Sequence, residues 1–229
     1  MSKSNSIIRK IYSEKKGEKF IKKSEPWSVL LIGRVFGTPL ARLFAKIGLK
    51  PNHVTIFTVP FSFIAGYFFF TNRLYLGALF YFIGYILDCS DGTLARLTNQ
   101  VSRFGERLDY YTDIINNIPM YFGLWYSQFY LHDMWFIGAG IIAFHYMVMA
   151  FGYIFLDKLT YKTISPRICS YYMHADEGFL TFAIAPITGY FYLVLPILVG
   201  LQFISYIILF FTQKEKPDFK NNIKKMLKL

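Results

Sequence analysis

Long apolar stretches alternate with short polar ones along most of the chain. Six of them approach the roughly 20 apolar residues that a transmembrane helix needs. Together they leave no room for a separate soluble domain. The pattern therefore predicts an all-α integral membrane protein with six transmembrane helices. These spans are expected at about 52–71, 74–95, 108–130, 134–156, 178–193 and 194–212.

A further apolar segment precedes the first span, at 27–47, but it carries three basic residues. Such charges disfavour a spanning helix and suit a helix that lies in the membrane interface. Gly48 then marks the end of this helix, and Pro51 the beginning of the first span. We therefore expect an interfacial amphipathic helix before the six spans. The expected domains are a basic arm (1–26), a membrane domain (27–213) and a basic tail (214–229).

The net charge of +11 could indicate a nucleic-acid partner, but the placement of the basic residues argues against one. Of the 25 Lys and Arg residues, only Arg73 lies on the opposite side of the expected spans from the rest. This bias marks the cytoplasmic side of a membrane protein. Residues 1–25 also lack the apolar core of a secretory signal. We expect a multi-pass membrane protein with both termini in the cytoplasm and no nucleic-acid partner.

Four aspartates lie where two apolar stretches meet a short polar connection on that same side. Asp88 and Asp91 are three residues apart, and Asp109 and Asp113 are four apart, so each pair shares one helix face. Two antiparallel helices joined by a short turn can bring these faces together. Carboxylates are costly at this depth and usually face a cation or a polar cavity. Oxygen ligands alone favour Mg²⁺ or Mn²⁺, and the sequence predicts a site for one or two such ions.

Small and basic residues accompany the aspartates. Gly92 and Ala95 leave room for a bulky ligand, and Gly105 lies four residues before Asp109 on the same face. Arg96 adds a positive charge suited to phosphate. Metal ions that bridge phosphate oxygens make phosphoryl transfer the natural reaction class. A cation transporter is the alternative of a different class, since intramembrane carboxylates also mark ion pathways.

The stretch from Asp88 to Asp113 resembles the signature of the CDP-alcohol phosphotransferase (CDP-alcohol phosphatidyltransferase) family. That signature is Asp, two residues, Asp-Gly, two residues, Ala-Arg, eight residues, Gly, three residues, Asp, three residues and Asp, and every fixed position matches. The resemblance implies a six-span enzyme, usually a homodimer. It implies that the enzyme transfers a substituted phosphoryl group from a CDP-linked alcohol to an acceptor hydroxyl and releases CMP.

The same resemblance assigns roles to individual residues. It implies that the four aspartates Asp88, Asp91, Asp109 and Asp113 hold two Mg²⁺ or Mn²⁺ ions. It also makes Asp113 the catalytic base that takes the proton of the acceptor hydroxyl. The implied nucleotide- and donor-binding residues are Asn52, Thr55, Gly92, Ala95, Arg96, Ser102, Arg103 and Gly105.

Members of this family differ in the donor and the acceptor that they use. One branch uses CDP-diacylglycerol and a polar alcohol, and another uses CDP-choline or CDP-ethanolamine with diacylglycerol. Glycerol-phosphate members commonly carry an Arg after Pro-Asn-x-x-Thr, where this chain has Thr58 and Pro60. We predict CDP-diacylglycerol with an inositol phosphate-, inositol-, glycerol phosphate- or serine-like acceptor, and keep the choline/ethanolamine type as the alternative. A phosphorylated acceptor would need basic residues on the cytoplasmic side, and the candidates are Lys158, Lys162 and Arg167.

Overall fold

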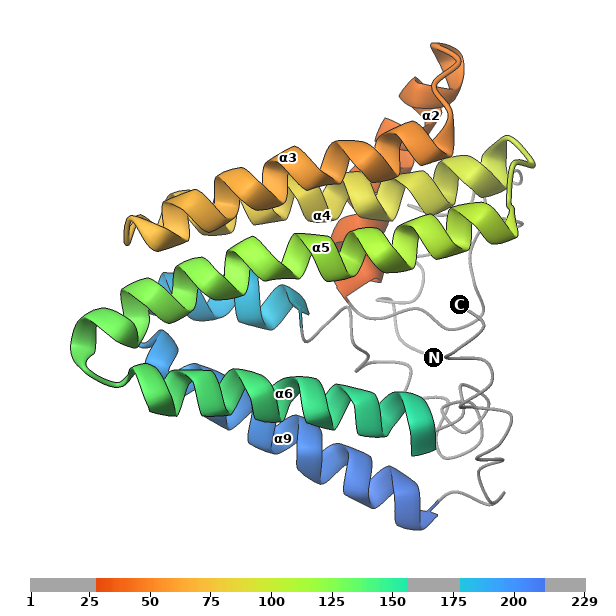
Figure 1. Cartoon of the computed structure of the whole chain (residues 1–229). Helices are drawn as coiled ribbons and strands as arrows, with labels where there is room; N and C mark the ends of the chain where they lie inside the picture. Colours follow the sequence, from red (N-terminus) through yellow and green to blue (C-terminus); the bar gives the residue numbers. More distant parts are fainter. Residues whose placement is uncertain (1–27, 156–177, 213–229) are drawn as a thin grey trace, which may run out of the picture.

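The protein is entirely helical in the parts that the computed structural model describes, residues 28–155 and 178–212 (Figure 1). Six helices exceed two turns, and shorter helical turns connect or extend them. In chain order the elements are η2 (Val29–Gly37), α2 (Thr38–Lys46), α3 (Pro51–Phe70), α4 (Leu74–Leu97), α5 (Arg103–Gln128), η3 (Tyr130–His132), α6 (Trp135–Phe155), η5 (Leu180–Ile184), η6 (Ala185–Thr188) and α9 (Phe191–Thr212).

Three helices in the described ranges are long and apolar enough to cross a membrane: α3, α4 and the Phe191–Ile208 part of α9. Helix α5 is not among them: its first three turns carry five charged side chains, and its remaining turns include Asn116, Asn117 and Gln128. The helices expected at 52–71, 74–95, 108–130 and 134–156 all form. Six membrane crossings, the cytoplasmic orientation and the homodimer stay predictions.

The bounds expected for the last two spans, at 193 and 194, lie a few residues too late, whereas the turn residues Thr188-Gly189-Tyr190 mark the break correctly. The chain turns at Gly189, whose φ of 73° lies in the left-handed region that glycine adopts without strain. Helix α9 then begins at Phe191 and continues to Thr212 through Pro196. The preceding turns η5 and η6 end at Thr188. A proline in the second turn of a membrane helix is tolerated where neighbours satisfy the freed carbonyl, so Pro196 does not separate two spans.

Helices α3, α4 and α5 form the part of the fold that carries the aspartates. Helix α3 packs along both α4 and α5, and α6 pairs with α9 (Figure 1). In Figure 1 the α6–α9 pair diverges from α5 toward the end where α3 begins. The α4–α5 turn, which lies between the two pairs of signature aspartates, is at that same end.

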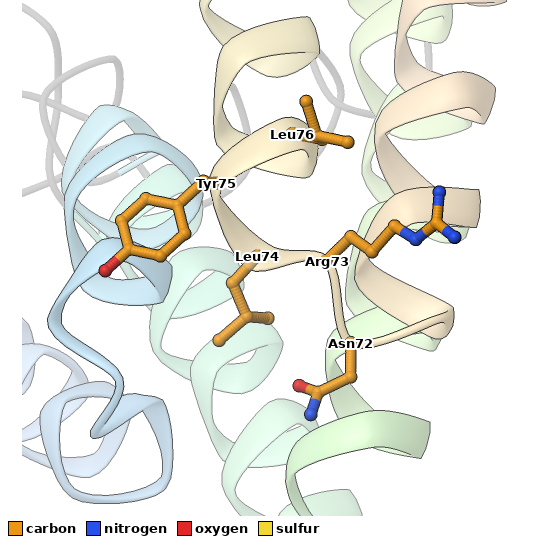
Figure 2. A pocket seen from close by; sticks show the side chains of 5 residues that line it. All are labelled: Asn72, Arg73, Leu74, Tyr75 and Leu76. Atoms are coloured by element: carbon orange, nitrogen blue, oxygen red, sulfur yellow. The ribbon is translucent and has the colours of Figure 1, made fainter.

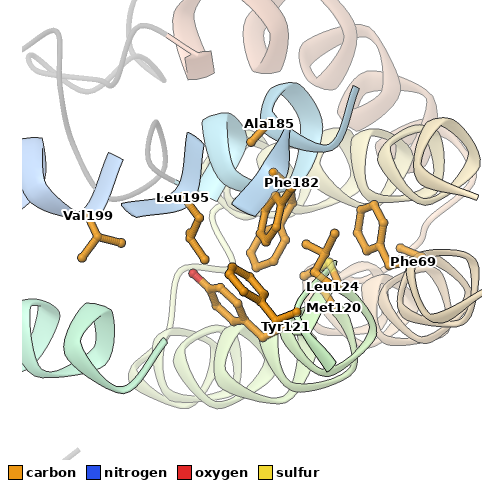
Figure 3. Close-up of a cluster of buried hydrophobic side chains, with 11 residues drawn as sticks. Phe69, Met120, Tyr121, Leu124, Phe182, Ala185, Leu195 and Val199 are labelled. Atoms are coloured by element: carbon orange, nitrogen blue, oxygen red, sulfur yellow. The ribbon is translucent and has the colours of Figure 1, made fainter. Parts of the chain in front are cut away.

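The main hydrophobic core lies toward the other end, where α3, α5, η5, η6 and α9 meet (Figure 3). Tyr121 and Phe182 stack edge to face there, with ring centroids 4.7 Å apart. Phe69 and Leu124 are completely buried beside them. This core fixes the far ends of α3 and α5 and leaves their signature ends to be held by other contacts.

Helix η2, the first described helix, packs across α4. Ser28 is buried and accepts a hydrogen bond from the Tyr85 hydroxyl at 2.7 Å. A Cβ at Gly33 would lie 2.7 Å from the Cys89 sulfur, so the two helices approach closely at this glycine. Val29 and Ile32 pack against the cluster around Tyr85. Phe36 contacts Phe82 of α4 edge to face, whereas Leu31 is more than half exposed. The helix therefore turns both polar and apolar groups toward α4, and its interfacial location stays a prediction.

Candidate metal and nucleotide site

The turn between α4 and α5 brings the two pairs of aspartates to the same end of the fold. Helix α4 ends at Leu97, and Asn99 follows in the left-handed region with φ 56°. Ser102 caps α5 by accepting a hydrogen bond from the Gly105 amide at 3.0 Å. The short polar connection expected between the two pairs is confirmed at residues 98–102, and it makes the two signature helices antiparallel neighbours.

Three carboxylates converge across this turn. Asp88, Asp91 and Asp109 each place an oxygen within 4.8 Å of the oxygens of the other two. Asp91 is the buried member, with 6% of its surface exposed. Asp113 lies one turn further along α5, where it is exposed to solvent. Three of the four carboxylates therefore converge, and the part of Asp113 in the same site stays a prediction.

This arrangement fits a hard divalent cation. All donors are carboxylate oxygens, their separation lets one ion contact all three residues, and a cation would relieve their mutual repulsion. The chemistry of the donor set thus agrees with the Mg²⁺ or Mn²⁺ predicted from the sequence. Binding of a second ion, and the part of Asp113 as a fourth ligand, stay predictions.

Helix α3 contributes directly to the carboxylate cluster. The hydroxyl of Thr55, buried in the first turns of α3, donates a hydrogen bond of 2.5 Å to Asp91 Oδ2. A hydrogen bond to a carboxylate is short and roughly twice as strong as one between neutral groups. Thr55 therefore fixes the rotamer of the buried ligand and leaves the other carboxylate oxygen for a cation.

Asn52 and Gly105 meet across the α3–α5 contact beside the cluster. A Cβ at Gly105 would lie 3.3 Å from the Asn52 side-chain oxygen and 3.2 Å from the Ser102 hydroxyl. Only a glycine allows these polar groups to gather at this point without a shift. Asn52 and Thr55, implied only by the family resemblance, thus lie at the same end as the aspartates.

Two arginines bind the same threonine on the signature helix. Arg96 donates to the Thr93 hydroxyl at 3.3 Å, and Arg34, from η2, donates to it at 3.1 Å. The Arg96 guanidinium also lies over Gly92, 3.4 Å from the position a Cβ would take there. Arg34 is only 6% exposed, and it was not among the site residues expected from the sequence. Its position within the otherwise uncharged run 27–41 was the signal that could have identified it.

The remaining residues expected to bind the nucleotide or the acceptor differ in burial, and some lie outside the described ranges. Ala95 is half-buried on α4, whereas Ser102 and Arg103 at the start of α5 are exposed. Contact of these three with a nucleotide stays a prediction. The proposed acceptor-binding residues Lys158, Lys162 and Arg167 lie outside the described residues.

A cavity of about 380 Å³ lies at the opposite end of the bundle, away from the aspartates (Figure 2). Its lining comes from the α3–α4 connection and the first turn of α4, and no lining residue is acidic. It offers no carboxylate ligand for a metal. The lining residues are Asn72, Arg73, Leu74, Tyr75 and Leu76.

Sequence comparisons agree with this site. A family model described as CDP-alcohol phosphatidyltransferase matches residues 49–216. Archaetidylinositol phosphate synthase of Pyrococcus horikoshii is 35% identical over 89 residues, which cover 38% of this chain and 47% of the relative. Phosphatidylinositol phosphate synthase of Mycobacterium tuberculosis is 34% identical over 99 residues, which cover 42% of this chain and 45% of the relative. The chain therefore spans about half the length of the curated relatives it matches.

Solved structures share the fold. A crystal structure of the Mycobacterium tuberculosis phosphatidylinositol phosphate synthase in complex with manganese and citrate has a TM-score of 0.53 and 18% identity, and covers 78% of this chain and 90% of that one. A structure of the same protein with CDP-DAG bound has the same TM-score and identity, and covers 78% of this chain and 94% of that one. At this identity the similarity establishes the helical fold alone.

Proposed function

Because the chain belongs to the CDP-alcohol phosphatidyltransferase family, we propose that it is a membrane transferase that makes an inositol phosphate lipid. Its donor is CDP-diacylglycerol, its acceptor is the hydroxyl of an inositol phosphate, and CMP is released. Relatives named as synthases of phosphatidylinositol phosphate and archaetidylinositol phosphate support this acceptor. The observation that carries the reaction class is the set of converging oxygens of Asp88, Asp91 and Asp109.

The carboxylate cluster supplies the metal site of this proposal. Asp88, Asp91 and Asp109 would hold Mg²⁺ or Mn²⁺, and Asp113 would join them as a ligand of a second ion. The ions, when bound, neutralise the developing charge on the pyrophosphate of the donor. Thr55 keeps Asp91 oriented by its hydrogen bond, so the buried ligand does not have to reorganise when the donor arrives.

Asp113 is suited to act as the base because it lies beside the cluster and remains exposed. Its carboxylate takes the proton of the acceptor hydroxyl while that oxygen attacks the phosphorus that bears the lipid. A new phosphorus–oxygen bond forms, the bond to the CMP phosphate breaks, and its electron pair leaves with CMP. The proton on Asp113 then passes to water, which returns the base to its starting state.

The residues around the cluster would bind the nucleotide. Gly92 and Gly105 provide room on α4 and α5, and Arg96 holds a fixed positive charge above Gly92. Asn52 presents a polar side chain at the α3–α5 contact. Ala95, Ser102 and Arg103 complete the proposed donor site, and Lys158, Lys162 and Arg167 are proposed for the acceptor phosphate.

One experiment tests the proposal. The purified protein is incubated with Mn²⁺ or Mg²⁺ and one donor at a time. CDP-diacylglycerol is offered with inositol phosphate, inositol, glycerol phosphate or serine as the acceptor. CDP-choline is offered with diacylglycerol. We expect CMP release and an inositol phosphate lipid only with CDP-diacylglycerol and inositol phosphate, and neither in EDTA. A different lipid product would correct the substrates. No CMP from any combination would refute the enzyme and favour a cation transporter.

A further inference from the structure

A stripe of buried hydroxyl groups runs down one face of α3. Thr55, Thr58 and Ser62 are spaced by three and four residues and therefore lie on the same side of the helix. Their exposed fractions are 5%, 2% and 5%, although α3 is apolar enough to span a membrane. Buried hydroxyls in such a helix need hydrogen-bond partners. Each finds a backbone carbonyl of α3 and, in addition, a side chain on one of the two signature helices.

The stripe joins α3 to both signature helices. On α4, Asp91 accepts from the Thr55 hydroxyl at 2.5 Å. On α5, the amide of Asn116 donates to the Thr58 hydroxyl at 2.9 Å. The Ser62 hydroxyl lies 2.9 Å from the Asn116 side-chain oxygen, and its single proton is shared between that oxygen and the Val59 carbonyl at 2.8 Å. Asn116 thus contacts α3 through both its nitrogen and its oxygen.

Asn116 shares a helix face with the signature carboxylates of α5. It follows Asp109 by seven residues and Asp113 by three, so the three side chains form one row along α5. Any rotation or sliding of α5 that breaks the amide contacts therefore moves both carboxylates relative to α3. The positions of Asp109 and Asp113 relative to α3 therefore change together with the contacts of Asn116.

An amide specifies register in a way that apolar packing does not. Leucine and methionine side chains accept several neighbouring positions with little loss, whereas Asn116 keeps both its contacts only at one axial position of α5. A single buried asparagine fixes register in the same manner between the helices of coiled coils. The hydrophobic core begins one turn further along, at Ala65 and Met120, so Asn116 makes the polar α3–α5 contact between that core and the carboxylates.

We propose that Asn116 is a positioning residue that fixes the register of α5 against α3 and thereby holds Asp109 and Asp113 at the metal site. The consequence for catalysis rests on the proposed function, but the consequence for metal binding does not. A misplacement of about 1 Å is enough to cost up to a hundredfold in rate.

Metal binding by the purified full-length protein tests this role without any substrate. Mn²⁺ alone is titrated, and free Mn²⁺ is followed by its electron paramagnetic resonance signal. Residues that orient metal ligands change affinity by about 10–100-fold, and we expect Asn116→Ala to weaken Mn²⁺ binding about tenfold. Asn117→Ala is the matched control, because its side chain points about 100° away around α5. It should bind Mn²⁺ within twofold of wild type.

A second pair of variants separates positioning from general loosening of the fold. Leu124→Val mildly destabilises the buried core of the same helix and should leave Mn²⁺ affinity unchanged. The double variant Thr58→Asn with Asn116→Thr exchanges the two hydrogen-bonding partners between α3 and α5. It should recover most of the lost affinity, which a purely structural role would not do.

The outcomes are distinct. Unchanged Mn²⁺ affinity in Asn116→Ala, or an equal loss in Leu124→Val at similar thermal stability, would overturn the positioning role. Failure of the exchanged pair to recover affinity would overturn the hydrogen-bond explanation. If wild type and variants bind Mn²⁺ as expected while wild type releases no CMP, the positioning role stands and the proposed function fails.

Discussion

The close contact between α3 and α5 allows a prediction whose size follows from the structure. Gly66 on α3 and Gly123 on α5 face each other, and neither has room for a side chain. A Cβ at Gly66 would lie 2.5 Å from the Pro119 carbonyl oxygen and 2.6 Å from its carbonyl carbon. Both atoms belong to the backbone and cannot rotate away, so Gly66→Ala must separate the helices.

The required movement is about 1 Å, because van der Waals contact becomes ordinary only at 3.4 Å. Overpacking of this kind costs about 1–3 kcal/mol, and a chain of this length loses roughly 2–4 °C of melting temperature per kcal/mol. We therefore expect Gly66→Ala to lower the melting temperature by about 2–12 °C. CMP release, measured well below that temperature, should also fall, because the Ser62–Asn116 contact lies one turn away.

Thermal unfolding of the protein in detergent, with CMP release as the second readout, checks this prediction. Gly140→Ala on α6 is the control, because a Cβ there meets no heavy atom of the described residues within 4 Å. Alanine favours a helix over glycine by about 1 kcal/mol, so the control should keep or raise the melting temperature. A Gly66→Ala protein that melts within 1 °C of wild type would refute the close packing of α3 on α5.

Three further predictions concern the site itself. Asp113→Asn should lower CMP release about 10²–10⁴-fold with donor binding largely kept, whereas Asp88→Asn should weaken Mn²⁺ binding as well. Single-turnover kinetics, donor binding and Mn²⁺ titration measure these effects, and a near-normal rate in Asp113→Asn excludes it as the base. Thr55→Val should destabilise the metal-free protein by about 1.5–3 kcal/mol, because Asp91 loses a charge-assisted hydrogen bond. Thermal unfolding should show that Mn²⁺ recovers part of this loss. An equal loss with and without Mn²⁺ would contradict a link between the Thr55 hydrogen bond and metal binding at Asp91. Ser102→Ala should cost about 1 kcal/mol of stability through the lost cap, and Ser102→Asp should retain it, since aspartate also caps helices.

Much of the site could be predicted from local spacing. The aspartates lie three and four residues apart within each pair, and this spacing places each pair on one helix face wherever the helix goes. The short polar connection between the pairs forces the two helices to be antiparallel neighbours. Asp88, Asp91 and Asp109 therefore converge as expected. Both helices extend beyond the expected spans, α4 to Leu97 and α5 from Arg103.

The last span begins three residues before its expected start at 194. Hydropathy continues across this region, so only turn residues locate the break, and Thr188-Gly189-Tyr190 mark it in the sequence. Pro196 lies in an early turn of α9, where a proline loses one hydrogen bond and the helix continues around it. Gly189, with its left-handed backbone, is the actual turn.

Sequence alone thus determined the helical elements, the carboxylate spacing and the family of this protein, because these depend on periodicity and on residues near one another along the chain. Tertiary structure alone decided that Thr55 holds Asp91, that Arg34 is buried against Thr93, and that Asn116 joins α5 to α3. These contacts link residues 36 to 59 positions apart. Their existence depends on the rotation and register of packed helices, which no local pattern encodes.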